Sequence, residues 1–130
     1  MNKVAKDGPI KVPIKALDEL APGDEEIALL KVDVEGYEKF VFVGAQEILK
    51  RVKCITYESC ENFYKEYGYH KEDVSQLLRQ EGFVIFSFND NIITPVSDDH
   101  NLDGCETLLA IRDINDFLAR TSMTLAKSSR

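Results

Sequence analysis

The spacing of hydrophobic residues changes several times along the chain. Residues 27–34, "IALLKVDV", are nearly continuous in apolar side chains, a pattern typical of a strand buried on both faces of a parallel sheet. From Tyr37 to Leu49 apolar residues recur at helical spacing, with Glu38 among the polar residues on the opposite, solvent-facing side, which predicts one amphipathic helix. A glycine weakens a helix interior, so we expect Gly44 and Ala45 to let this helix pack closely against the sheet.

The second half of the chain repeats the alternation of strand-like and helix-like patterns. The sequence predicts strands over 53–59, 83–88 and 106–111 and helices over 70–82 and 113–122. Strands that alternate with helices indicate an α/β fold with a mostly parallel sheet. No helix is predicted between the last two strands, so we expect them to form an antiparallel C-terminal strand pair at one edge of the sheet.

The two ends of the chain differ from this pattern. We expect a flexible N-terminus over 1–9, one folded domain over 10–121 and a flexible tail over 122–130. Ile10, Val12 and Ile14 alternate with polar residues, which predicts a short strand, and Pro13 would confine that strand to a sheet edge. Asp18 is expected to cap a brief helical turn.

Composition narrows the possible functions. The 130 residues suit a single domain, and 23 acidic against 16 basic residues give a net charge of −7. This balance argues against nucleic acid or an anionic membrane as a partner, because both attract basic surfaces. No apolar run approaches the roughly 20 residues of a membrane span, and the N-terminus lacks the apolar core of a signal peptide. We therefore expect a soluble, cytoplasmic protein.

Cysteine usage and one acidic loop bear on metal binding and redox chemistry. Three cysteines without a C-x-x-C pair predict neither a disulfide framework nor a zinc site. The loop "DHNLDG" (99–104) resembles the start of a calcium loop, but Ala110 stands where a bidentate glutamate is required. We interpret 99–104 as a polar hairpin loop and expect no metal site. The aromatic segment 64–69, "YKEYGY", is expected to be a mobile lid or a packing segment.

Acidic residues gather where the predicted strands end. Asp33 and Glu35 follow one strand and Glu58 ends the next, and the carboxyl ends of such strands are where α/β sheets bind ligands. In one interpretation Glu35 and Glu38 only favour the start of the following helix. In the other, a carboxylate cluster binds hydroxyls, an amine or a metal ion. The pattern alone leaves both open.

These residues carry a resemblance. The stretch "LLKVDVEGYEKFVFVGAQEIL", preceded by "KALDEL" and followed by "CITYES", resembles the FkbM family of S-adenosylmethionine-dependent methyltransferases. The matching positions are those of the lysine–aspartate–glutamate–glycine run, the next glutamate and the glycine–alanine pair: Lys31, Val32, Asp33, Val34, Glu35, Gly36, Glu38, Gly44 and Ala45. Glu58 matches an acidic residue common at the end of the next strand. The resemblance covers roughly residues 10–90.

The resemblance implies a partial class I methyltransferase (Rossmann-like) sheet and S-adenosylmethionine as cofactor. It also implies methyl transfer to a hydroxyl of a sugar, another glycan or a small molecule. Such a reaction depends on placing the acceptor oxygen in line with the methyl group. We expect Asp33 to orient the hydroxyl or accept its proton, with Glu35 and Glu58 as orienting or metal-binding partners.

One part of the family pattern is missing. No two of the seven glycines have the G-x-G spacing of a cofactor loop, so the chain looks like the C-terminal part of such an enzyme and its cofactor-binding residues are unknown. Strand 27–34 would then lie at an open edge, where unpaired backbone groups invite a homodimer, although segment 10–14 is also placed to cover that edge. The alternative function is a non-catalytic α/β remnant that binds a partner through the open strand.

Overall fold

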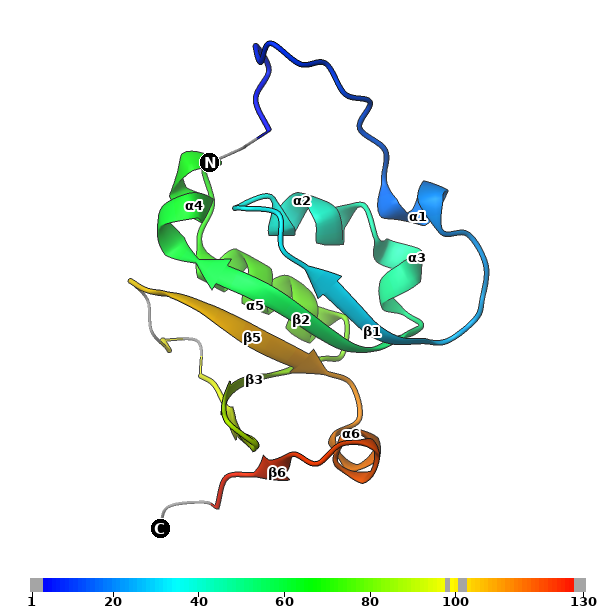
Figure 1. Ribbon diagram of the computed structural model, residues 1–130, viewed down its shortest axis with the longest axis vertical. Helices are drawn as coiled ribbons and strands as arrows, with labels where there is room; N and C mark the ends of the chain where they lie inside the picture. The colour runs from blue at the N-terminus through cyan, green and yellow to red at the C-terminus, as the bar shows by residue number, and fades with distance from the viewer. Residues whose placement is uncertain (1–3, 98, 101–102, 128–130) are drawn as a thin grey trace.

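A six-stranded sheet organises the described part of the chain (Figure 1). The computed structural model describes residues 4–97, 99–100 and 103–127. The strand order is β1-β2-β5-β3-β4-β6. The strands are β1 (Ile27–Val32), β2 (Val52–Cys60), β3 (Val84–Asn89), β4 (Ile92–Pro95), β5 (Cys105–Ile111) and β6 (Thr124–Leu125). The helices are α1 (Leu17–Leu20), α2 (Glu38–Val43), α3 (Gln46–Leu49), α4 (Glu61–Glu66), α5 (Lys71–Gln80) and α6 (Ile114–Arg120).

The α/β class is confirmed, but the sheet is mixed. β1 pairs in parallel with β2 and β4 with β6, while the other three neighbouring pairs are antiparallel. The expected antiparallel pairing of the strands at 83–88 and 106–111 is present, between β3 and β5. It does not lie at an edge, because β5 is inserted between β2 and β3, and β4 and β6 extend the sheet beyond β3.

This topology also corrects the interpretation of 99–104. β4 and β5 both pair with β3, one on each side of it, so the segment between them crosses from one side of β3 to the other. A hairpin loop would require β4 and β5 to be neighbours. Within the segment, Asn101 lies outside the described residues.

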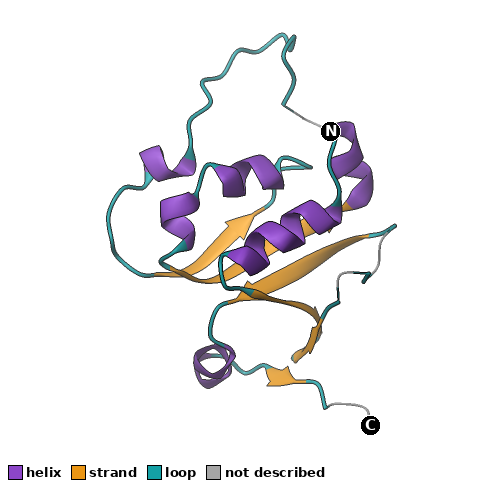
Figure 2. Cartoon of the chain, turned by 180° about the vertical axis from the view of Figure 1, so that it is seen from behind, coloured by secondary structure: helices purple, strands orange, loops and turns teal. Residues whose placement is uncertain are grey.

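Each face of the sheet has its own core. Ile55 and Tyr57 of β2 point to the face covered by α2–α5 (Figure 2), which holds the larger cluster of buried residues. Cys54 points to the opposite face, where α6 covers a smaller cluster through Phe117. β1 is less enclosed than the sequence predicted: Ala28, Leu29 and Lys31 are exposed, so this strand is not buried on both faces.

The single helix predicted over 37–49 is two short helices, α2 and α3, separated at Gly44 and Ala45. The close approach made at Gly44 is to Ala16 rather than to the sheet, since a Cβ on Gly44 would lie 3.3 Å from the Ala16 Cα. The Gly44 carbonyl accepts a hydrogen bond from the Asp18 backbone N–H at 3.0 Å. The break in the helix therefore makes room for the α1 segment.

The N-terminal segment differs most from expectation. Residues 10–16 form no strand, and the side chains of Ile10, Val12 and Ile14 are exposed at 79%, 68% and 66%. At the other end, Thr124 and Leu125 of the predicted tail form β6 beside β4. The longest helix of the described residues is α5, with 10 residues, and none is long and apolar enough to cross a membrane.

Cys60 and Cys105 are joined by a disulfide, which contradicts the expectation that the cysteines form no disulfide framework. They are directly opposite each other on β2 and β5, so a pairing register set by the whole sheet brings together two cysteines 45 positions apart. Cys54 is a buried free thiol.

Candidate functional site

The structure brings Asp33, Glu35 and Glu58 together. One carboxylate oxygen from each lies within 4.8 Å of the others. Because β1 and β2 run in parallel, their carboxyl ends meet at the same rim of the sheet, and this places Asp33 and Glu35 after β1 beside Glu58 near the end of β2. We call these three residues the acidic trio. The predicted juxtaposition is confirmed, while the catalytic role of the trio stays a prediction.

An unusual backbone turn sets the geometry after β1. Glu35 has a φ of 53°, in the left-handed region that side chains other than glycine rarely adopt, and Gly36 follows with a φ of 99°. A Cβ on Gly36 would lie 2.9 Å from the Phe63 Cβ, so α4 packs directly on the turn. Backbone strain of this kind, held in place by packing, is common at functional sites.

Glu38 stabilises the same turn from the buried side. Its side chain is fully buried, and Oε1 accepts a hydrogen bond from the Val34 backbone N–H at 3.1 Å. The other oxygen, Oε2, has no hydrogen-bond partner among the described residues. Burial raises the pKa of Glu38. The helical pattern placed Glu38 on the polar face, and that placement is wrong. Glu38 lies in the first turn of α2, and its hydrogen bond joins the start of this helix to the turn that precedes it.

Electrostatics distinguish Glu58 within the trio. Burial raises the pKa of Glu58, and the negative charges of Glu35 and Asp33 raise it further. Its Oε2 is buried and has no hydrogen-bond partner among the residues that the structure describes. Asp33, by contrast, is half-exposed and forms a long ion pair with Lys31, at 3.9 Å. The trio thus has an outer carboxylate that a ligand can reach and an inner one that favours taking up a proton.

Two tyrosines of the aromatic segment support the rim. The Tyr64 hydroxyl donates to the Glu58 carbonyl at 2.7 Å, and the Tyr69 hydroxyl donates to the Gly36 carbonyl at 2.5 Å. Their rings are buried and stacked, with centroids 4.7 Å apart. Of the two readings of 64–69, packing is therefore correct for Tyr64 and Tyr69. Sequence reasoning missed their hydrogen bonds, because no local spacing indicates which backbone carbonyl a tyrosine reaches.

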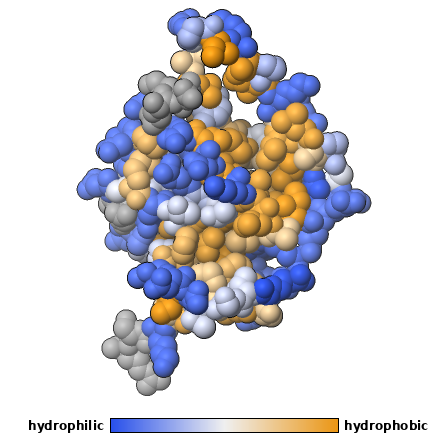
Figure 3. Space-filling view, viewed as in Figure 1, coloured by the Kyte–Doolittle hydropathy of each residue, from blue (hydrophilic) through white to orange (hydrophobic). Residues whose placement is uncertain are grey.

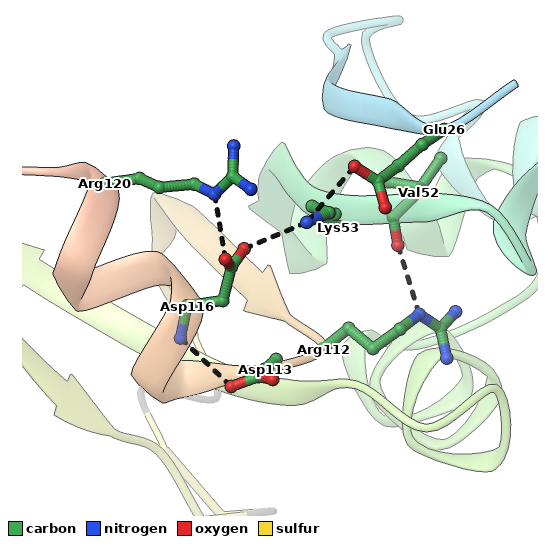
Figure 4. A network of polar contacts seen from close by, with 7 residues as sticks. All are labelled: Glu26, Val52, Lys53, Arg112, Asp113, Asp116 and Arg120. Atoms are coloured by element: carbon green, nitrogen blue, oxygen red, sulfur yellow. Dashed lines mark hydrogen bonds and ion pairs between the residues drawn. The ribbon is translucent and has the colours of Figure 1, made fainter.

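A pocket lies at the opposite end of the strands. Figure 4 shows its polar side, where Lys53 Nζ lies 3.1 Å from both Glu26 and Asp116, and Asp116 also pairs with Arg120 at 2.8 Å. The pocket, of about 450 Å³, has an apolar floor that includes Leu29. These charges already neutralise one another, and the site is at the amino ends of β1 and β2. It does not have the position at which α/β sheets bind their substrates.

The described residues are better suited to bind a hydroxylated or cationic ligand than a nucleoside cofactor. A trio of carboxylate oxygens suits a hydroxyl, an amine or a hard cation such as Mg²⁺. A nucleoside cofactor in an α/β sheet needs a glycine-rich turn open to the ligand. The turn at Gly36 is filled by Phe63, and no glycine-rich loop follows a strand in the part of the chain that the structure describes. The residues present therefore do not form a cradle for S-adenosylmethionine.

Comparison with known proteins agrees with this geometry. The model of one protein family, described as the methyltransferase FkbM domain, matches residues 3–85. The matched region contains β1, the strained turn, β2 and all three carboxylates of the trio. No curated protein and no solved structure matches the chain.

Proposed function

Because the chain belongs to the FkbM methyltransferase domain family, we propose that it takes part in S-adenosylmethionine-dependent O-methylation and supplies the acceptor side of the reaction. The acceptor is a hydroxyl of a sugar, another glycan or a small molecule. The observation that supports this proposal is the acidic trio at the carboxyl ends of two parallel strands. S-adenosylmethionine would supply the methyl group as a sulfonium, and its binding residues are not among those described.

The three carboxylates would act in different ways. Asp33, the most accessible, accepts a hydrogen bond from the acceptor hydroxyl and orients its oxygen. Glu58 has a raised pKa, so it is suited to hold the proton that the hydroxyl loses. Glu35 keeps the negative charge close to both through its strained backbone.

Calorimetry with a panel of hydroxylated sugars and with S-adenosylhomocysteine tests the proposal. We expect a sugar of the panel to bind, and Asp33→Asn to weaken that binding about tenfold by replacing a charged acceptor with a neutral amide, while the fold is kept. Asp7→Asn, which changes a carboxylate of the N-terminal segment outside the site, is the control. Binding that is equal in Asp33→Asn and the wild type would reassign Asp33 to a structural role.

Cofactor binding separates this function from a second one. Micromolar affinity for S-adenosylhomocysteine would make the chain a self-sufficient enzyme, in contrast to the acceptor-side role proposed here. If neither sugar nor cofactor binds while the circular dichroism spectrum shows an intact fold, a non-catalytic interaction module is favoured. The observation that supports this second function is the outer edge of β1, which has no neighbouring strand among the described residues.

A further inference from the structure

The outer edge of β1 has an ordered set of backbone groups available for pairing. The Ile27 N–H bonds to the Arg51 carbonyl on the β2 side, and backbone groups alternate in direction along a strand. Ile27, Leu29 and Lys31 therefore face β2, while Ala28, Leu30 and Val32 direct their N–H and C=O groups outward. β1 is the terminal strand of the sheet, so these outward groups meet no strand within the described residues (Figure 1).

The segment 10–15, "IKVPIK", has the alternating pattern of a strand but pairs with no strand in the described structure. In the described structure its backbone forms no hydrogen bond to other backbone groups, and it arches away from the sheet before α1 (Figure 1). Ile10, Val12 and Ile14 alternate with polar residues and remain exposed. Three large apolar side chains at this spacing are costly to leave in water, and pairing against a sheet edge would cover them in part.

The position of Pro13 selects one side of this segment for pairing. In an extended strand, Ile10, Val12 and Ile14 would direct their backbone groups to one side and would present three donors to the three outward carbonyls of β1. Pro13, which has no N–H, falls on the other side and would face solvent. A strand added in this way cannot receive a further strand at Pro13, so the assembly closes instead of growing into a fibre.

Charge favours the same pairing. Segment 10–15 carries Lys11 and Lys15. The Lys11 ammonium donates a hydrogen bond to the Lys6 carbonyl. Neither lysine forms an ion pair with another described residue. β1 is preceded by Asp24, Glu25 and Glu26 and followed by Asp33. Like charges directly opposite each other weaken strand pairing and unlike charges strengthen it. A basic strand is therefore a better partner for this edge than a second copy of the acid-flanked β1 itself.

We propose that segment 10–15 of a second copy of this chain adds as a strand to the outer edge of β1, and that the exchange is mutual and forms a closed dimer. A surface of this kind uses main-chain hydrogen bonds for affinity and the alternate side chains for register. Leu29 of β1 is itself exposed, at 58%, and the space-filling view shows hydrophobic residues gathered on the face of the molecule turned toward the viewer (Figure 3). This inference concerns assembly and is independent of the proposed function.

Light scattering coupled to size-exclusion chromatography tests the dimer, with two matched proline variants. The wild type should have twice the 14.7 kDa mass of the chain. Val12→Pro removes a donor from the paired side and should weaken the dimer about tenfold or more. Lys11→Pro places the same residue on the solvent side and should weaken it no more than about fivefold, as expected for the loss of one exposed ion pair.

Hydrogen exchange identifies the surface. In the wild type the amides of Ala28, Leu30 and Val32 should be protected, and in Val12→Pro they should exchange faster, at an unchanged melting temperature of the monomer. A wild type that is monomeric at high concentration would overturn the proposal. So would a monomer in which these three amides are protected, because the segment would then fold back onto its own chain. Equal weakening by both prolines would mean that the dimer uses another surface.

Discussion

At the scale of single residues, the turn after β1 is stabilised by residues whose structural role the hydrophobic pattern does not indicate. Glu38 was expected in solvent and is instead buried beneath the turn, bonded to the Val34 amide. Gly36 is expected from the family pattern, but its reason is steric: its α-hydrogen side faces Phe63. The acidic trio lies next to these residues, so its geometry depends on side chains outside the trio.

Gly36→Ala should destabilise the protein by about 2–4 kcal/mol, since it adds a Cβ to a residue with positive φ and drives it into Phe63. Gly68→Ala is the matched control. Gly68 also has a positive φ, of 81°, but open space where its Cβ would be, so it should lose only the conformational part, about 1 kcal/mol. Urea unfolding measures both. Equal losses would show that α4 does not press on the turn.

Glu58→Gln should stabilise the fold at neutral pH by up to about 1 kcal/mol while it weakens binding of the acceptor. Burial and the charges of Glu35 and Asp33 raise the pKa of Glu58 above its unfolded value, so its ionised form costs stability in the folded state. That cost appears as the pH rises through the folded pKa and is absent below the unfolded value of 4.5. The difference in melting temperature between variant and wild type should therefore shrink on acidification; a constant difference would contradict the charge argument.

At the scale of elements, α3 shows how a very short helix is kept in place. It has four residues, too few to be stable alone. The Asp18 carboxylate accepts hydrogen bonds from the Glu47 and Ile48 amides at its start, at 3.0 and 2.9 Å. At its other end the Arg112 guanidinium donates to the Leu49 carbonyl at 2.5 Å. An acid and a base from distant parts of the chain thus satisfy the groups that the helix leaves unpaired.

Asp18→Ala should cost about 1–2 kcal/mol, the usual loss when a capping side chain is removed. The Glu47 and Ile48 amides should lose their protection first, which hydrogen exchange can resolve. Glu19→Ala changes the neighbouring carboxylate, for which no capping hydrogen bond is present in the described structure, and should leave stability within about 0.5 kcal/mol. The sequence predicted that Asp18 caps the helical turn in which it lies. Its side chain instead caps a helix about 30 positions away.

At the scale of the whole molecule, features with a local cause could be predicted and those set by distant pairing could not. β1, β2, β3, β5, α5 and α6 follow from hydrophobic period, and the trio follows from the ends of β1 and β2. The position of β5 inside the sheet does not follow from the hydrophobic period. It depends on which of several similar strands pairs with the free edge of β2. The disulfide was missed for the same reason: only the register between β2 and β5 brings Cys60 opposite Cys105.

Reduction of the disulfide should lower stability by about 2–4 kcal/mol, because a closed loop of this size restricts the unfolded chain. Melting with and without a reducing agent measures the change. Cys105→Ser should melt like the reduced wild type and show no response to the agent. Cys54→Ser, at the buried free thiol, should keep the response. A wild type that melts identically under both conditions would show that the bond does not contribute.

The interior position of β5 also has a consequence for synthesis on the ribosome. The strand that joins β2 to β3 begins only at Cys105, so β1 with β2 and β3 with β4 emerge as two groups of strands without the one that links them. Until that strand leaves the exit tunnel, β2 and β3 each expose a hydrogen-bonding edge. A nascent chain stalled before β5 should therefore be sensitive to protease, and resistance should appear abruptly once the strand has emerged.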